Sequence, residues 1–202
     1  MKVNARNPLK VGFVQVNFER DNQYFMPLSV LYLQARAQKH LKHPENFEFL
    51  MPNFRREDIE PFSERLSEAK VIAYSHYTWN ANFNLALAKR IKERNPSVIN
   101  IFGGPHVPDL IERQRQVNGK VVFEKTDDGR TRPVRDRFPE RVEAWHKKHP
   151  YVDAACHGEG EQVFTRFLAN ITNEDPLSGL VPSLSFLNYD GQLVVTPKAG
   201  RI

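Results

Sequence analysis

The sequence is almost without cysteine: Cys156 is the single one among 202 residues. One thiol excludes a disulfide within the chain, and it excludes a zinc ribbon or an all-cysteine iron–sulfur site made by this chain alone. Any metal chemistry must therefore use histidine and carboxylate ligands or come with a bound cofactor. Because Cys156 lies inside an apolar run, we expect a small core residue and not a nucleophile.

Long hydrophobic runs are also missing. No apolar run exceeds four residues, as at 30–33, 71–74 and 85–88. Runs of this length are too short for a membrane-spanning helix or for the hydrophobic core of a signal peptide. We therefore expect a cytoplasmic protein with no membrane partner.

An excess of charge of one sign is confined to one segment. Of the net charge of +5, residues 111–150 carry +4, from eleven basic and seven acidic side chains. A nucleic-acid surface would interleave basic and aromatic residues on one face, whereas residues 130–137 alternate basic residues with Thr, Pro, Val and Asp. We therefore expect a solvated insertion here and no nucleic-acid partner.

Three common catalytic or binding motifs are absent. Neither a G-x-x-x-x-G-K-[ST] phosphate loop nor a G-x-G-x-x-G dinucleotide motif follows the first apolar run. The chain also has no G-x-S-x-G elbow, which argues against a hydrolase of that type.

Five short apolar runs are present, with residues at helical spacing between them and after the last. Because the runs are nearly continuous and not alternating, they are typical of parallel strands covered by helices on both faces. The pattern predicts an α/β fold with strands at residues 11–16, 47–50, 71–75, 98–102 and 152–156.

Two segments fall outside this repeat. Within residues 112–137, the turn pairs Asn118-Gly119 and Asp128-Gly129 flank a short β-favouring stretch, which predicts a hairpin-like surface insertion before a helix over 139–148. Near the end of the chain, Asp190-Gly191 separates two apolar stretches and predicts a C-terminal β-hairpin.

The loops that follow the predicted strands are the candidate site. In an open parallel sheet, ligands bind beyond the carboxyl ends of the strands, at the point where the strand order reverses. We therefore expect one cleft to be formed by residues 17–20, 75–80, 103–106 and 157–161.

Each candidate in these loops has an ordinary structural alternative. Gly103 and Gly104 can admit a large ligand to the backbone, or they can form a plain turn. The stretch from Gly158 to Glu161 can present amide N–H groups to a ligand, or its acidic residues can simply complement a helix dipole.

His76, Tyr77 and Trp79 place three aromatic groups on one loop. Such side chains can line a flat, largely apolar ligand. The alternative is that Trp79 covers the core while Tyr77 is partly exposed.

Taken in order, three segments resemble a known family. VIAYSHYTWN at 71–80, GGPHVP at 103–108 and VDAACHGEGE at 152–161 resemble the N-terminal cobalamin-binding domain of B12-dependent radical SAM enzymes. The likeness extends over about 10–110 and 145–202. It implies a flavodoxin-like doubly wound parallel sheet of five strands, ordered 2-1-3-4-5, with a C-terminal β-hairpin.

The resemblance also implies a division of the chain. Residues 1–181 would form the cobalamin-binding domain, with the insertion at about 112–137, and residues 182–202 the hairpin that leads toward a radical SAM barrel. The family's barrel carries a C-x-x-x-C-x-x-C motif that this chain lacks. The chain would therefore not be catalytic alone, and S-adenosylmethionine and the [4Fe-4S] cluster would belong to a barrel supplied in cis or in trans.

The resemblance implies a place for the cofactor. The nucleotide tail would enter the cleft against small residues, and the corrin ring would lie over the loop after the third strand, positioned for methyl or other group transfer to a small-molecule or peptide substrate. No D-x-H-x-x-G motif supplies a histidine below the cobalt. His76 is a candidate cobalt ligand, although it could equally hydrogen-bond a corrin amide or water. The implied site comprises Ser75, His76, Tyr77, Trp79, Asn80, Gly103, Gly104, Pro105, His106, Gly158, Glu159 and Gly160.

Two other functions stay open from the sequence. The same fold could be a non-catalytic docking or substrate-recognition module that binds no cobalamin, with the basic insertion as its interface. A different α/β protein, such as a flavin or nucleotide binder, is the second alternative.

Overall fold

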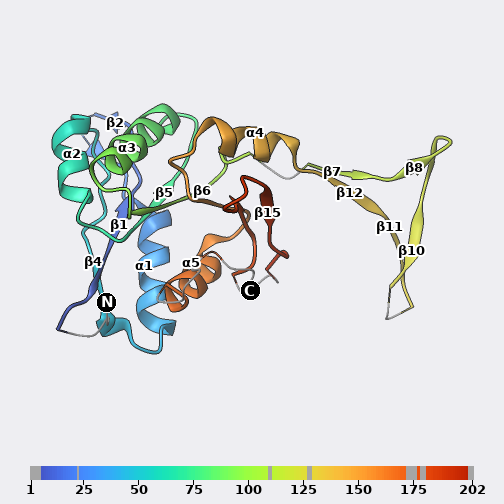
Figure 1. Ribbon diagram of the computed structural model, residues 1–202, viewed down its shortest axis with the longest axis horizontal. Coiled ribbons are helices and arrows are strands. Elements are labelled where there is room, and N and C mark those ends of the chain that lie inside the picture. Colours follow the sequence, from blue (N-terminus) through green and yellow to red (C-terminus); the bar gives the residue numbers. More distant parts are fainter. Residues whose placement is uncertain are drawn as a thin grey trace.

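A seven-stranded sheet forms the centre of the molecule, in the order β15-β14-β13-β6-β5-β1-β4 (Figure 1). The computed structural model describes residues 6–21, 23–108, 111–126, 129–171, 177 and 181–199. Numbered along the chain, the parallel strands follow the order 2-1-3-4-5, so the predicted flavodoxin-like fold is confirmed. These strands are β1 (Leu9–Val14), β4 (Phe47–Phe49), β5 (Val71–Ser75), β6 (Ile99–Gly103) and β13 (Ala154–Cys156).

Helices cover both faces of the sheet. One face carries α1 and α5, which pack around Phe13 and Phe167, and the other carries α2 and α3, which pack around Phe62 and Phe102. Every residue of β5 is buried as a result, which explains why the apolar runs are continuous. The helices are α1 (Leu28–His40), α2 (Ile59–Leu66), α3 (Ala81–Arg94), α4 (Glu140–Lys148) and α5 (Gly160–Ala169), with a 3-10 turn η1 (Pro44–Asn46) before β4.

The pairing register brings the predicted loops to one edge of the sheet. Ser75 at the end of β5 is the partner of Gly103 at the end of β6. Ala155 of β13 pairs with Phe102, so β13 ends beside the same edge. The loops after these three strands therefore begin next to one another.

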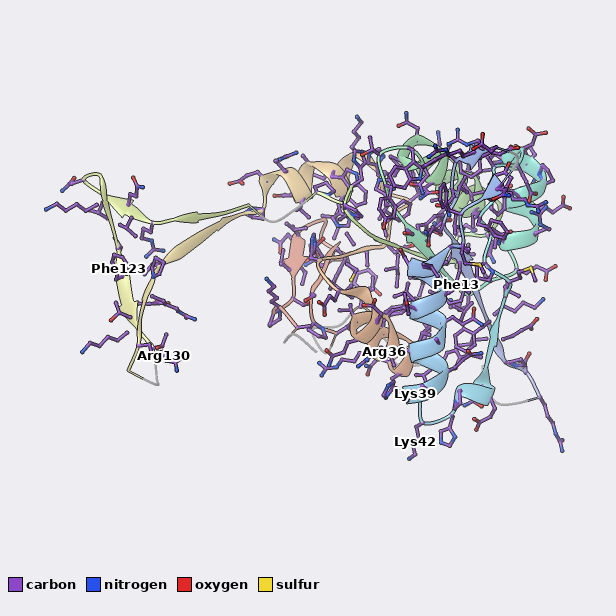
Figure 2. All side chains as sticks on the ribbon, turned by 180° about the vertical axis from the view of Figure 1, so that it is seen from behind. Phe13, Arg36, Lys39, Lys42, Phe123 and Arg130 are labelled. Carbon is purple, nitrogen blue, oxygen red and sulfur yellow. The ribbon has the colours of Figure 1, made fainter. Side chains whose placement is uncertain are left out.

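The insertion is a long antiparallel arm that projects from the body (Figures 1 and 2). The sequence predicted one hairpin here, whereas the described residues of the arm form three strand pairs, β7 with β12, β8 with β9 and β10 with β11. Asn118 and Gly119 form the predicted turn with positive φ angles, and Asp128 lies outside the described residues. The strands are β7 (Ile111–Gln114), β8 (Gln116–Val117), β9 (Lys120–Val121), β10 (Phe123–Lys125), β11 (Thr131–Pro133) and β12 (Arg135–Phe138).

The predicted C-terminal hairpin is present and joins the main sheet. It consists of β14 (Leu184–Leu187) and β15 (Leu193–Val195), and β14 runs antiparallel to β13. Gly191 in its turn has a φ of 71°, a left-handed conformation that favours glycine.

A small pair of strands, β2 (Glu19–Arg20) and β3 (Gln23–Tyr24), was not predicted; it lies in the loop between β1 and α1. In the part of the chain that the structure describes, no helix combines the length and the apolar character needed to cross a bilayer.

Candidate functional site

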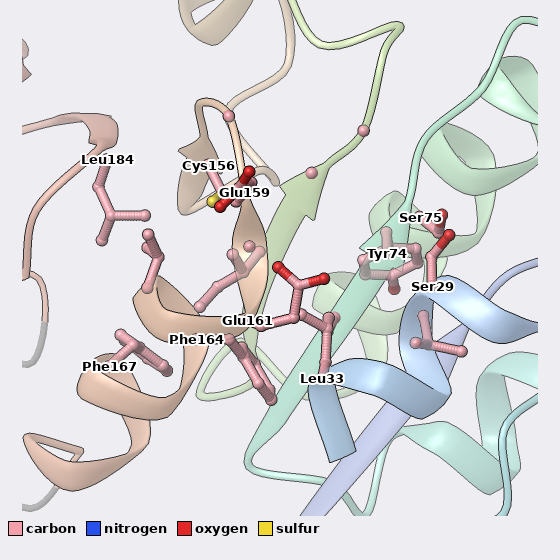
Figure 3. Close-up of a pocket in the computed structure, with 18 of the residues that line it drawn as sticks. Ser29, Leu33, Tyr74, Ser75, Cys156, Glu159, Glu161, Phe164, Phe167 and Leu184 are labelled. Carbon is pink, nitrogen blue, oxygen red and sulfur yellow. The ribbon is translucent and has the colours of Figure 1, made fainter. Parts of the chain in front are cut away.

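A cavity of about 210 Å³ lies at the carboxyl ends of β5, β6 and β13, between α1 and α5 (Figure 3). It is open at the edge of the sheet where the predicted loops meet. Seven predicted site residues line it: Ser75, Tyr77, Gly103, Gly104, Gly158, Glu159 and Gly160.

The walls of the cavity are apolar with a few polar groups. Figure 3 shows Ser29 and Ser75 on one side, Phe167 and Leu184 on the other, and the Glu161 carboxylate between them. Few polar anchors on an apolar wall are typical of sites for small organic ligands and cofactors.

Gly103 and Gly104 have different physical roles. A Cβ atom at Gly103 would meet Cys156 Cβ at 3.6 Å, an ordinary contact, so the absent side chain of Gly103 leaves free space in the cavity. Gly104 has a φ of 111°, and a Cβ there would lie 2.8 Å from the carbonyl oxygen of His76. Gly104 is therefore required by the turn of the backbone. Gly103 fits the alternative that a missing side chain leaves room for a ligand.

His76 packs against residues of the core cluster on the opposite face of the sheet from the cavity and does not line the cavity. Its side chain is 1% exposed and packs against the rings of Phe102 and Trp145, with centroid distances of 5.1 and 6.2 Å. Its backbone N–H donates to the carbonyl of Gly103 at 2.6 Å. Its role as a cobalt ligand stays a prediction, because the ring is below the surface in this structure.

The His76 imidazole is neutral at pH 7. Burial, with smaller contributions from His106 and His149, lowers the pKa of His76 to about 4. Its Nδ1 atom has no hydrogen-bond partner among the described residues.

Asn80 holds the loop after β5 in place. Its Oδ1 accepts the backbone N–H of Tyr77 at 2.8 Å, and its Nδ2 donates to the carbonyls of Val16 and Ser75, both at 3.0 Å. The residue is fully buried and lies outside the lining of the cavity. Its observed contacts therefore position Tyr77 and Ser75.

Tyr77 and Trp79 extend from the cavity to the surface. Their rings stack with centroids 4.5 Å apart, and the Tyr77 hydroxyl lies 3.4 Å from Ser29 Oγ at the cavity wall. Trp79 is 46% exposed, so it does not cover the core. Pro105 and His106 are exposed and do not line the cavity.

Sequence reasoning missed the helical side of the site except for Glu161, which lies in the predicted loop 157–161. Ser29 and Leu33 of α1 and Glu161, Phe164 and Phe167 of α5 line the cavity. The apolar ones also pack in or against the core, and cavity-facing positions follow the same helical spacing.

Cys156 lines the cavity but is chemically inert there. Burial, with a smaller contribution from the nearby Glu161 carboxylate, raises the pKa of its thiol to about 12. The prediction of a small core residue is confirmed by its burial. Across the described residues, no group of three or more His, Cys, Asp or Glu side chains could hold a metal ion.

The chain was compared with known proteins. No protein-family model matches it. It is 31% identical over 189 residues to "Cobalamin-dependent radical SAM methyltransferase TokK" of Streptomyces tokunonensis, which covers 93% of this chain and 23% of TokK. Over most of its length, this chain is homologous to part of a cobalamin-dependent radical SAM enzyme. The resemblance found in the sequence is thereby confirmed.

A second relative is also a methyltransferase, and a solved structure shares the fold. The chain is 27% identical over 181 residues to 2-(S-pantetheinyl)-carbapenam-3-carboxylate methyltransferase of Streptantibioticus cattleyicolor, covering 90% of this chain and 21% of that protein. The fold matches OxsB, a cobalamin-dependent S-adenosylmethionine radical enzyme solved with aqua-cobalamin and S-adenosylmethionine bound, with a TM-score of 0.63 at 13% identity, over 96% of this chain and 23% of OxsB. The chain thus spans less than a quarter of the length of these proteins.

Proposed function

We propose that this chain is a cobalamin-binding domain of a radical SAM enzyme and holds the corrinoid for methyl or other group transfer. The observation that carries the proposal is the cavity at the carboxyl edge of the sheet, in a homologue of cobalamin-dependent enzymes. The position matches the ligand site of doubly wound folds.

The size of the cavity selects the part of the cofactor that enters it. A volume of about 210 Å³ is too small for a corrin macrocycle with its side chains, and it suits the fused two-ring base of the nucleotide tail. Val30, Leu33 and Phe164 supply apolar contacts for such a base. Gly103 leaves space beside Cys156 for its approach to the backbone.

Polar groups at the cavity can orient the rest of the tail and the corrin amides. The hydroxyls of Ser29 and Tyr77 can donate or accept hydrogen bonds, and the carboxylates of Glu159 and Glu161 accept them from amide N–H groups. These four side chains line the cavity from α1, from the loop after β5 and from the start of α5 with its N-cap residue. They would hold the cofactor and exclude water from its tail.

The protein residues bind and orient the cofactor, and the corrin-bound cobalt supplies the capacity to carry and transfer a methyl group. We also propose that residues 182–202 lead toward a radical SAM barrel that carries S-adenosylmethionine and the [4Fe-4S] cluster and presents the substrate. The length of the relatives supports this, since the chain covers 21–23% of them.

Hydroxocobalamin added to the purified chain tests the proposal. We expect a changed visible spectrum and corrinoid that stays with the protein through desalting. Gly103→Leu fills the cavity from a backbone position that a side chain can adopt, so this variant should retain no corrinoid.

Ala169→Leu is the matched control, because it creates the same side chain, with one carbon less added, at an exposed position of α5. It should bind hydroxocobalamin like the unmodified chain. An unmodified chain that binds no corrinoid, or a folded Gly103→Leu variant that binds it normally, would contradict the proposal.

A further inference from the structure

The arm, residues 111–138, exposes apolar side chains that the body does not cover. It projects away from the body, and Phe123 lies on it far from the central sheet (Figure 2). Phe123 is 59% exposed and Val117 56%, and neither core cluster includes an arm residue. A single exposed apolar residue would be ordinary on a protein surface. These two residues, however, have the same kind of neighbour.

The two faces of the β10–β11 pair differ in charge. Side chains alternate between the faces along each strand, and directly paired residues of antiparallel strands share a face. Phe123 and Lys125 therefore lie on one face, whereas Glu124 and its partner Arg132 lie on the other. Glu124 and Arg132 form an ion pair of 2.8 Å and neutralise each other. The face of Phe123 is apolar and cationic, with no carboxylate among its described residues.

The same combination recurs in the β8–β9 pair. Val117 is the direct partner of Lys120, so an exposed apolar side chain again lies beside an exposed lysine on one face. Neither Lys120 nor Lys125 has an ion-pair partner among the residues that the structure describes. The arm thus presents two apolar side chains, each next to a lysine whose charge is not compensated within the described chain.

The outer part of the arm carries an excess of positive charge. Residues 115–134 contain five basic and three acidic side chains, and two of the acidic ones, Asp127 and Asp128, lie outside the described residues. Such an excess attracts an acidic partner and steers its approach. Two arms would repel each other, so the charge disfavours a contact with a second copy of this chain. The five basic side chains are all exposed: Arg115, Lys120, Lys125, Arg130 and Arg132.

We propose that the arm docks a protein partner whose contact surface is acidic and includes apolar side chains. Phe123 and Val117 would pack on the apolar part of that surface, and Lys120 and Lys125 would pair with carboxylates around it. Apolar anchors surrounded by polar and charged groups are the usual arrangement of protein interfaces. Apolar side chains beside each lysine match a protein surface better than the phosphate backbone of a nucleic acid. This docking surface is independent of the proposed function, because none of its residues lines the cavity.

A fluorescein-labelled peptide of alternating glutamate and leucine residues represents such a surface. Fluorescence anisotropy follows its binding to the purified chain. We expect saturable binding that weakens as the salt concentration is raised, because the charges that pair are exposed. A peptide with serine in place of leucine should bind about fivefold more weakly, since the apolar contacts are lost. A peptide with lysine in place of glutamate should not bind.

Substitutions on the arm locate the binding surface. Lys120→Glu combined with Lys125→Glu should weaken the glutamate–leucine peptide by about tenfold or more, because two attractive charge pairs become repulsive. Phe123→Ala should weaken it by about fivefold through the lost apolar contact. All three side chains are exposed and lie outside the core clusters, so thermal unfolding of these variants should match that of the unmodified chain. Their hydroxocobalamin affinity should also be unchanged.

Lys39→Glu combined with Lys42→Glu is the matched control. It makes the same change of charge at exposed positions of the body, where α1 ends (Figure 2). This variant should bind the glutamate–leucine peptide like the unmodified chain. A chain in which an Asn-Gly turn replaces residues 115–134 should not bind it, because the exposed lysines and apolar side chains of the arm are then absent.

Four results would overturn the proposal. One is no binding of the glutamate–leucine peptide, and another is an equal loss in the arm and body variants, which would reflect the net charge of +5 alone. A DNA duplex that the arm binds more tightly than the peptide, with Phe123→Ala unchanged, would assign the arm to nucleic acid. Self-association in light scattering that Phe123→Ala abolishes would assign it to a contact between copies of the chain.

Discussion

His76 and His146 both pack against Trp145, and each is 1% exposed. His146 shares the Ser185 hydroxyl with His157: its Nε2 lies 3.0 Å from Ser185 Oγ, and His157 Nε2 lies 2.8 Å from the same oxygen. Burial is the main cause that lowers the pKa of each of these two buried histidines to about 4. Two buried, neutral imidazoles therefore pack in the core around Trp145.

The depressed histidine pKa values predict loss of stability in mild acid. In the unfolded chain His76 and His146 protonate near pH 6.5, whereas in the folded chain they protonate near pH 4. Between these two pH values the unfolded state binds more protons than the folded state. The free energy of unfolding is therefore highest above pH 6.5. It should fall as the pH drops toward 4, by up to about 3 kcal/mol for each histidine.

Urea denaturation at pH 7 and pH 4.5 measures this loss. His146→Gln should show a smaller decrease than the unmodified chain, because one of the two titrating groups is gone. His40→Gln, at an exposed position at the end of α1, should show the full decrease. Equal decreases in all three proteins would show that the buried histidines do not set the acid sensitivity.

Adding one methyl group at Gly103 and at Gly104 should change the stability of the fold by different amounts. Gly104→Ala should lower the free energy of unfolding by about 2 kcal/mol, because the residue adopts a φ of 111° and its Cβ would clash with the His76 carbonyl. Gly103→Ala should change it by no more than about 1 kcal/mol. Urea denaturation of both variants tests this, and equal effects would contradict the distinct roles assigned to the two glycines.

At the scale of elements, the strand order could be predicted because buried parallel strands are continuous apolar runs. The ends of the strands could not be predicted in the same way. For example, β1 ends at Val14, whereas the apolar run continues to Val16. Past the strand, Gln15 N–H still donates to the carbonyl of Asn53 at 2.9 Å, and Asn17 N–H to that of Phe54. Gln15 and Asn17 are buried although they do not belong to the regular hydrogen-bonded strand. An apolar, buried run therefore predicts a strand that is too long.

The arm shows another limit of sequence patterns. Backbone hydrogen bonds of 2.8–2.9 Å connect Arg115, Val122 and Val134 at a junction where the three strand pairs meet. Turn residues such as Asn118-Gly119 mark a reversal of the chain, but nothing in their spacing indicates which strands pair across a junction. One hairpin was therefore predicted in place of three pairs.

Shortening the arm should leave the body intact. Gln114 and Arg135 are partners at the end of the β7–β12 pair, so an Asn-Gly turn can join them in place of residues 115–134. Neither core cluster includes an arm residue. The melting temperature of the body and its hydroxocobalamin affinity should equal those of the full chain. A drop in either would show that the arm supports the body.

At the scale of the whole molecule, the sequence located the site at the carboxyl edge but described only half of it. The loop glycines, Ser75 and Tyr77 were predicted and line the cavity. The helical wall formed by Ser29, Val30, Leu33, Val163, Phe164 and Phe167 was not predicted. A helix face that borders a cavity has the apolar spacing of one that packs on a sheet, so only the assembled fold distinguishes them.

Because α1, α5 and three strands enclose the cavity together, a ligand bound there should stabilise the fold as a unit. Hydroxocobalamin at a free concentration of one hundred times its Kd should raise the free energy of unfolding by about 2.7 kcal/mol, if only the folded state binds it. Gly103→Leu should show no such gain. Urea denaturation with and without the corrinoid measures both.

Amide hydrogen exchange should show where that stabilisation acts. The amides of residues 158–163 and 28–33 border the cavity and should exchange more slowly with hydroxocobalamin bound. Exchange in α2, which lies on the opposite face of the sheet, should slow only through the global gain in stability. Protection that is no greater at the cavity than in α2 would mean that the corrinoid binds elsewhere, since a ligand inside the cavity must restrain both helices that form its walls.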